Sequence, residues 1–343
     1  MLRKEHVAPY IKARENTVTV MAEVIIALVA LYVMAFVYYG ARAVALGAVC
    51  VLTTVVTEIV CTFLGGKKTI SRNYTPVVTG LLIPLMMPAA IPYYVVIIAG
   101  VFAIFVVKYP FGGTGSNLFN PALAGFAFCA VSFPKQVFLY SLPMEKLPVI
   151  MKSLPQIMNY GTEHVLRGGG VPAYSLSDFL LGEIPGPMGA THILVLLACL
   201  VFLFLRKRIR FELIVSFFVT FVLMILMLNR LPNVSPVKMI VYELFSGMLL
   251  FAGIFALSEP VTSPKRNLAK IFYGFFTAVA TVLFNYFSSF DGAVIFAILL
   301  ANAFSPLFDL LAEEIVRNNH TPVTIGLEVL KFAKQIFTGK KNP

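Results

Sequence analysis

Four segments of the sequence combine polar side chains with glycine or proline between long apolar runs. They are 71–82 (SRNYTPVVTGLL), 111–122 (FGGTGSNLFNPA), 258–264 (SEPVTSP) and 290–302 (FDGAVIFAILLAN). In lipid every backbone polar group needs a partner, so broken segments persist only where protein encloses a site. Glycine permits close approach of a planar or anionic ligand, and a half-helix that begins after Gly115 presents free N–H groups. The segments therefore predict a ligand site inside a membrane protein.

The composition supports a membrane protein. Of 343 residues, 59% are hydrophobic and 13% are charged, whereas soluble domains carry about 25% charged residues. The net charge of +11 comes from basic residues at the ends of apolar runs, so no nucleic-acid partner is expected. The cysteines form no C-x-x-C pair and the histidines have no ligand spacing, so no metal site is expected. The first apolar run lacks a cleavage site and should stay as a helix.

Ten apolar runs are candidates for membrane spans, and they predict an all-α, polytopic protein. A full crossing takes roughly 20 residues, and a shielded half-helix takes fewer. The runs are 18–39, 43–64, 74–88, 92–108, 117–134, 190–206, 211–228, 240–257, 269–287 and 291–310. With both termini in the cytoplasm, 20 of the 27 basic residues lie inside, as expected for a protein of the cell inner membrane.

The segment 135–189 divides the chain. It is rich in proline and glycine, and this topology makes it extracytoplasmic. A connection of this length is usually functional. Five spans on each side, within 1–134 and 190–310, predict two membrane repeats of inverted topology. The tail 311–343 mixes charged and apolar residues and predicts an amphipathic helix on the cytoplasmic surface.

The four segments, in this order, resemble those of the D subunit of the Rnf ion-translocating ferredoxin:NAD oxidoreductase. They also resemble those of its relative, the B subunit of the sodium-translocating NADH:quinone reductase. The resemblance runs from about residue 8 to residue 310, and Glu259 stands where the family usually has Asp. It implies ten helices in inverted repeats, an FMN esterified to a threonine, and a second, non-covalent flavin such as riboflavin. The non-covalent flavin region then includes Gly112, Gly113, Asn117 and Asn120.

The covalent FMN site departs from the family pattern, in which the acceptor threonine closes a short S/T-G-A-T segment. Upstream of Phe179 in the loop, the one threonine is Thr162, which follows Tyr-Gly instead of Gly-Ala. Thr191 closes the literal string Gly-Ala-Thr but lies at the start of a span. Thr162 is the first candidate because it is expected in an exposed loop. Thr191 is the second, and a chain that carries no esterified FMN is the third possibility.

Carboxylates within the apolar runs are the remaining chemical signal, because a charge at membrane depth is costly and usually functional. Glu58 is either a ligand on an ion or proton pathway or the partner of a cation from a neighbouring subunit. Glu23 lies close enough to the cytoplasmic end to reach water.

The resemblance implies a membrane flavoprotein subunit that is not catalytic alone. It would relay electrons between ferredoxin and NAD modules, coupled to Na⁺ or H⁺ transport, with NAD or quinone as acceptor. Its partners would be the A, B, C, E and G subunits of an Rnf-type complex and the surrounding lipid. The alternative is a small-solute channel or transporter on the same helix bundle, and the third reading is a structural subunit that has lost its flavins.

Overall fold

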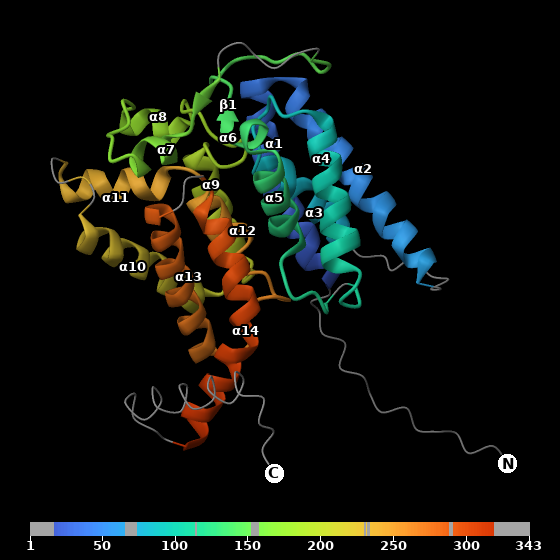
Figure 1. The fold of residues 1–343 in the computed structure, drawn as a ribbon, viewed down its shortest axis with the longest axis vertical. Helices are drawn as coiled ribbons and strands as arrows, with labels where there is room; N and C mark the ends of the chain where they lie inside the picture. The colour runs from blue at the N-terminus through green and yellow to red at the C-terminus, as the bar shows by residue number, and fades with distance from the viewer. Residues whose placement is uncertain are drawn as a thin grey trace.

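The computed structural model describes residues 17–65, 74–113, 115–151, 158–229, 231, 234–287 and 291–318 (Figure 1). Within these residues the protein is mostly helical. The strands there are β1 (Leu139–Tyr140) and β2 (Asn159–Tyr160), which pair antiparallel. Residues 71–73, Thr114 and Phe290 of the four motifs, and 319–343 of the predicted tail, lie outside the described residues.

Each apolar run predicted in the first half corresponds to a helix. They are α1 (Thr17–Tyr39), α2 (Ala41–Leu64), α3 (Thr75–Leu85), α4 (Tyr93–Val101) continued by the π-helix η1 (Phe102–Lys108), and α5 (Pro121–Ser132). The backbone between α3 and α4 is irregular, and Arg42 satisfies part of it. Its guanidinium donates to the carbonyl oxygens of Ala89 (2.9 Å) and Ile91 (2.8 Å). A basic side chain thereby supplies the partners that lipid cannot.

The loop segment carries three short helices, α6 (Pro134–Phe138), α7 (Thr162–Arg167) and α8 (Leu176–Leu181). The loop segment also bonds to the first half of the chain: the backbone N–H of Gly189 donates to the carbonyl of Leu85 at 2.8 Å. A Cβ on Gly189 would lie 2.7 Å from the Cβ of Leu85. The two backbones approach that closely because this residue has no side chain.

The second half contains α9 (Ile193–Leu205), α10 (Phe211–Leu228), α11 (Pro236–Phe245), α12 (Leu249–Phe255), α13 (Asn267–Phe287) and α14 (Ala293–Asn318). The predicted span 240–257 is in fact a pair of helices, α11 and α12, bent by 60°. Gly247 lies in the break with a φ of +63°. The last helix continues through Pro306 to Asn318, past the predicted end of the span at residue 310.

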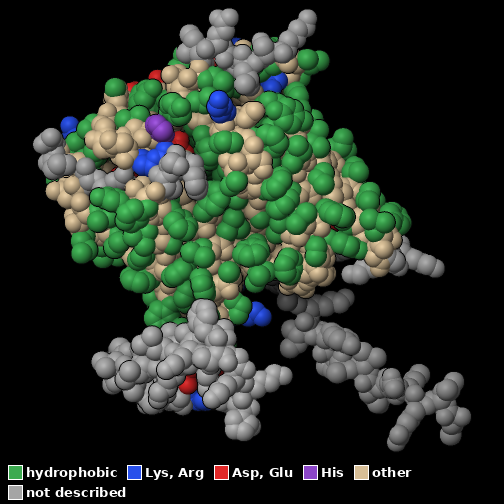
Figure 2. Space-filling model, in the orientation of Figure 1, with side chains coloured by type: hydrophobic (Ala, Val, Ile, Leu, Met, Phe, Trp, Pro, Cys, Tyr) green, Lys and Arg blue, Asp and Glu red, His purple; other side chains and the backbone are tan. Residues whose placement is uncertain are grey.

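Five of the described helices are long and apolar enough to cross a membrane: α1, α2, α10, α13 and α14. The bent pair α11–α12 makes a sixth candidate, and α3, α4–η1, α5 and α9 are shorter apolar helices. Figure 2 shows hydrophobic side chains over most of the visible middle of the molecule, with charged groups toward the top and the bottom. The chain is a multi-pass membrane protein.

The two ends of the molecule differ in what they contain (Figure 1). One end, which we call the terminal end, holds the start of α1, the turn after α9 and the turn 258–264. At this end Arg210 donates to Ser263 Oγ at 2.9 Å. The opposite end, which we call the loop end, holds the segment 135–189. There the N–H of Leu147 donates to the carbonyl of Tyr39 at 3.1 Å, which joins this segment to the turn between α1 and α2. The segments predicted on the same side of the membrane therefore meet.

Candidate functional site

A cavity of about 590 Å³ at the terminal end brings three of the four motifs together. We call it the motif pocket. From the motifs it takes Thr75, Val78, Thr79 and Leu82 of α3, Gly115, Asn117, Asn120, Pro121 and Ala122 of the glycine-rich segment, and Ser258, Glu259, Pro260 and Val261 of the turn after α12. The remaining wall comes from α1, from Lys108 at the end of η1, from the end of α12, and from the end of α9 with the turn that follows it. The convergence of segments so far apart in sequence makes this the principal candidate site.

The two predicted asparagines line the motif pocket, and their side chains shape its backbone. The Asn120 Oδ1 atom accepts the N–H groups of Ala122 (3.0 Å) and Leu123 (3.3 Å), which caps α5. The Asn117 amide donates to the carbonyl of Phe119 at 3.0 Å. Both residues are buried. They hold the start of α5 against the pocket, which is a positioning role.

The predicted glycines lie differently. Gly112 and Gly113 have positive φ angles of 103° and 89° and form the turn that leads into the pocket, but neither is among its described lining residues. A Cβ on Gly113 would meet no atom within 4 Å. Gly115 does line the pocket, with a φ of 96°. Of the glycines in this segment, Gly115 is therefore the one that lines the cavity.

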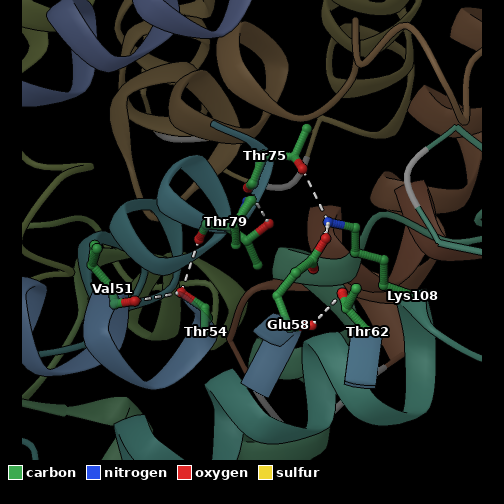
Figure 3. A network of polar contacts seen from close by, with 8 residues as sticks. Val51, Thr54, Glu58, Thr62, Thr75, Thr79 and Lys108 are labelled. Atoms are coloured by element: carbon green, nitrogen blue, oxygen red, sulfur yellow. Dashed lines mark hydrogen bonds and ion pairs between the residues drawn. The ribbon is translucent and has the colours of Figure 1, made fainter. Parts of the chain in front are cut away.

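Lys108 places a positive charge in the pocket wall, and Glu58 neutralises it (Figure 3). The Lys108 ammonium lies 2.8 and 2.7 Å from the two carboxylate oxygens of Glu58 and 3.0 Å from Thr75 Oγ1. The ammonium is almost completely buried and the carboxylate is 23% exposed. The partner of Glu58 is thus a cation of the same chain. A paired charge at this depth is far less costly than an isolated one.

Helices α2 and α3, beside the Lys108–Glu58 pair, are packed closely. Thr54 Oγ1 donates to the carbonyl of Pro76 at 2.8 Å and bridges α2 to the start of α3 (Figure 3). A Cβ on Gly80 would lie 2.6 Å from both Thr54 Oγ1 and Val51 Cα. Gly80 therefore lets α3 approach the backbone of α2, which brings Thr75 within reach of Lys108.

A second buried charge group stands beside the pocket. Glu23 of α1 is 4% exposed and forms ion pairs with Arg206 and Arg208, the second of which also lines the pocket. The expectation that Glu23 reaches water is wrong, because the carboxylate is 4% exposed and the turn after α9 supplies its cations. The residues are more than 180 positions apart in sequence, so hydropathy gives no indication that they pair.

The turn 258–264 is held from both sides. Glu259 accepts from Thr262 Oγ1 at 3.1 Å, and desolvation raises the pKa of its carboxyl to about 7. Arg210 bonds Ser263, and Asp309 of α14 accepts the backbone N–H groups of Lys265 and Arg266 at 3.0–3.1 Å. Asp309 therefore ties this turn to the last helix.

The fourth motif lies at the loop end, away from the motif pocket. There the Glu163 carboxylate accepts the N–H of Gly292 at 3.1 and 3.2 Å. Asp291 forms an ion pair with Arg167 at 2.8 Å. Burial raises the pKa of Glu163 to about 8, helped by the nearby Asp291, and burial also raises the pKa of Asp291. The fourth motif includes Asp291 and Gly292, but the sequence analysis missed Glu163 and Arg167, although their spacing places both on one face of a helix.

The two candidate threonines both lie inside the protein. Thr162 is the first residue of α7 and is 2% exposed, so the expectation of an exposed loop position is wrong. The reason is that Glu163, the next residue, anchors α7 to Gly292. Thr191 is also 2% exposed, and its hydroxyl has no hydrogen-bond partner among the described residues.

A model of the NQR2, RnfD, RnfE family matches residues 4–317. The chain belongs to this family. It is 28% identical over 309 residues to the D subunit of the Na(+)-translocating ferredoxin:NAD(+) oxidoreductase complex of Acetobacterium woodii, with 90% of this chain and 92% of that protein covered. It is 27% identical over 331 residues to the D subunit of the ion-translocating oxidoreductase complex of Haemophilus ducreyi, with 88% and 95% covered. The resemblance found in the four motifs is confirmed.

Proposed function

We propose that the chain is the membrane flavoprotein subunit of an ion-translocating oxidoreductase complex of the Rnf type. The family match and the names of the full-length relatives support a subunit that works with other subunits and is not catalytic alone. Electrons would pass between ferredoxin and NAD modules, coupled to Na⁺ or H⁺ transport. The observation that carries the flavin part is the convergence of three motifs on one cavity.

The motif pocket fits a non-covalent flavin such as riboflavin. Its volume of about 590 Å³ falls in the range of small-molecule sites, about 300–1,000 Å³. Val78, Leu82 and Phe255 supply apolar surface for a planar ring. The guanidinium of Arg208 supplies donors for its carbonyl groups or side chain, and Lys108 adds a positive charge to the wall. When bound, the flavin supplies one-electron relay chemistry.

The protein's contribution is to hold and enclose that group. The apolar walls exclude water, and the paired charges Lys108–Glu58 and Arg208–Glu23 keep the pocket close to neutral. The Asn120 cap fixes the entry of the glycine-rich segment. Glu58 is also our candidate for the ion pathway, because it lies beside the pocket with its carboxylate partly exposed.

An esterified FMN does not fit the threonines in this conformation. The side chains of Thr162 and Thr191 are each 2% exposed, and a Cβ on Gly186 would lie 2.7 Å from Thr191 Cγ2. Attachment to Thr162, the first candidate, requires α7 to leave its contact with Gly292. In-gel flavin fluorescence of Thr162→Val and Thr191→Val shows which of them is modified. Fluorescence that survives in both variants excludes both.

We also propose ten spans in two inverted repeats, with both termini in the cytoplasm of a cell with an inner membrane. Supporting this, each of the ten predicted runs overlaps a helix or a bent helix pair. The terminal end gathers Lys108, Arg206, Arg208 and Arg210, which favours its placement in the cytoplasm.

The flavin proposal is tested by filling the pocket. Val78, 9% exposed, lines the motif pocket, whereas Val131 of α5 is 70% exposed. In the purified complex, Val78→Phe should lower the acid-releasable flavin bound per chain by about tenfold or more. The matched control Val131→Phe should keep it. Equal flavin content in the two variants would remove the motif pocket as the site.

A further inference from the structure

A second, much smaller cavity lies at the loop end, where five helices meet. We call it the junction cavity. Its volume is about 10 Å³, which is the space of about one water-sized sphere. Its wall takes residues from α7, α11, α12, α13 and α14 and from the break between α11 and α12. Helix α7 lies beside α11 near the upper ends of α13 and α14 (Figure 1).

The wall of the junction cavity is part apolar and part polar. Leu166, Leu249 and Val294 form the apolar part, and each of them is at most 4% exposed. They close the cavity to solvent. A cavity with only such walls stays dry, whereas one with several polar groups in its wall can hold water. The polar groups therefore decide what this cavity contains.

Two oxygen atoms of the polar wall have no hydrogen-bond partner among the described residues. Ser246, in the break between α11 and α12, is 4% exposed, and its Oγ atom is buried without a partner. The buried Oδ1 atom of Asn285, on α13, is in the same condition. Leaving a buried polar atom without a partner is destabilising. Two such atoms in the wall of one cavity point to an occupant that bonds to both.

The chemistry of these atoms fits a molecule that can both donate and accept. The amide oxygen of Asn285 only accepts, whereas the hydroxyl of Ser246 donates or accepts. The other polar groups of the wall are the carboxyl groups of Glu163 and Glu243. Glu163 already accepts the N–H of Gly292, and Glu243 has an interaction of its own. The two atoms that need a partner are thus those of Ser246 and Asn285.

We propose that the junction cavity holds one buried water molecule that joins Ser246 to Asn285. The water donates to Asn285 Oδ1 and bonds Ser246 Oγ, and a carboxyl oxygen in the wall can take its third hydrogen bond. Buried waters make about three such bonds. A cation would have to lose its whole hydration shell to enter this space, which is costly, whereas a single neutral water has no charge to desolvate.

The water gives the broken span a partner that lipid cannot supply. Helices α11 and α12 are bent by 60° at the break that contains Ser246, and polar groups at a break need partners inside the protein. The water links this break to α13 and so holds the bend in place. The site lies at the opposite end from the motif pocket, so the inference goes beyond the proposed function and is independent of either flavin.

The test measures the apparent thermal unfolding midpoint of the purified full-length chain in detergent, at one scan rate. Ser246→Ala and Asn285→Leu should each lower the midpoint by about 1–4 °C, because each removes a hydrogen bond to the water. The double variant should lose less than the sum of the two, because both changes break one bridge. The matched control is Ser132→Ala, which removes an exposed hydroxyl at the end of α5 and should leave the midpoint unchanged.

Three other results would each overturn the proposal. If the cavity is empty, Ser246→Ala removes an unpartnered hydroxyl and should raise the midpoint. Additive losses in the double variant would mean that the two atoms share no occupant. The loss in Ser246→Ala should also be the same in sodium, potassium and choline chloride. A loss that appears only with sodium or potassium would mean that the occupant is a cation.

A direct observation covers the case in which a variant does not fold. A cryo-EM map of the wild-type complex that resolves ordered waters should show one peak within hydrogen-bond distance of both Ser246 Oγ and Asn285 Oδ1. A map that shows waters elsewhere in the protein but no peak between these atoms would overturn the proposal.

Discussion

The motif pocket differs in its buried charges from Glu163, Glu243 and Asp291 at the loop end, which we call the carboxylate cluster. Around the motif pocket Glu58 is paired with Lys108 and Glu23 with Arg206 and Arg208, whereas Glu259 accepts from Thr262 Oγ1. In the carboxylate cluster Asp291 is paired with Arg167, and burial, helped by the nearby Asp291, raises the pKa of Glu163 to about 8. A large cavity whose wall holds paired charges suits a planar, nearly neutral ligand, whereas Glu163 keeps a proton instead of a charge. The two ends of the bundle therefore differ in how buried carboxylates are stabilised.

The largest expected effect comes from unbalancing the motif pocket. Lys108→Met leaves the Glu58 carboxylate without its buried partner, and breaking a buried ion pair costs about 3–5 kcal/mol. The folded fraction in detergent and the thermal unfolding midpoint should both fall sharply. Adding Glu58→Gln to Lys108→Met should restore most of the loss, because no uncompensated charge then remains.

The control for this comparison is Lys135→Met, which removes an exposed lysine of α6 and should change stability little. A double variant no more stable than Lys108→Met alone would show that Lys108 acts through packing. The claim of balanced charges in the pocket wall would then be wrong.

A smaller effect on stability is expected from the close contact between α2 and α3 beside the Lys108–Glu58 pair. Gly80→Ala places a Cβ 2.6 Å from Val51 Cα, so α3 must move from α2 at a cost of about 1–3 kcal/mol. Thr75 should then lose its reach to Lys108. Gly168→Ala, whose Cβ would lie 3.5 Å from its nearest neighbour, is the matched control measured by the same unfolding midpoint. Equal midpoints would show that the two helices are free to adjust.

The carboxylate cluster predicts a dependence of stability on pH. In the folded protein the pKa of Glu163 is raised to about 8 from its ordinary value of 4.5. Between these two pH values the folded state therefore binds more protons than the unfolded chain, and the free energy of unfolding falls as the pH rises. Unfolding midpoints in potassium buffer should decline from pH 5 to 8, and Glu163→Gln should flatten the curve. A wild-type curve that rises over the window would contradict the raised pKa.

The orientation is tested by a substitution that should leave stability unchanged. Ala173 is exposed at the loop end, and the four native cysteines are buried. Ala173→Cys should react with an impermeant thiol reagent in intact spheroplasts. Reaction only after the membrane is broken would reverse the proposed topology, and with it the side on which the motif pocket lies.

Local signals in the sequence predict the helices well and their contacts poorly. The run 211–228 coincides with α10, since its ends carry basic and turn-forming residues. The break in the predicted span 240–257 was missed, because Ser246 and Gly247 are a short interruption that a predominantly apolar run of this length can include. Glu163 and Gly292 lie 129 positions apart, and no periodicity links such groups. The burial of Thr162 follows from the same contact, so the sequence could not predict it either.

The motifs themselves predict part of the candidate site. Three of the four converge on the motif pocket, as expected for segments that must line a protein-enclosed site. The walls from α1 and α9 have ordinary apolar sequences and carry no signal of their own. The role of Asn120 cannot be predicted from its residue type, because an asparagine that caps a helix and one that binds a ligand look the same in the sequence.

The central claim is that the motif pocket holds a flavin without a covalent bond. The decisive measurement is the flavin released by acid from the purified Thr162→Val/Thr191→Val double variant, with and without Val78→Phe. The double variant should release about one flavin per chain, and adding Val78→Phe should reduce this by about tenfold or more because the cavity is filled. Release of the same amount from both proteins would contradict the account.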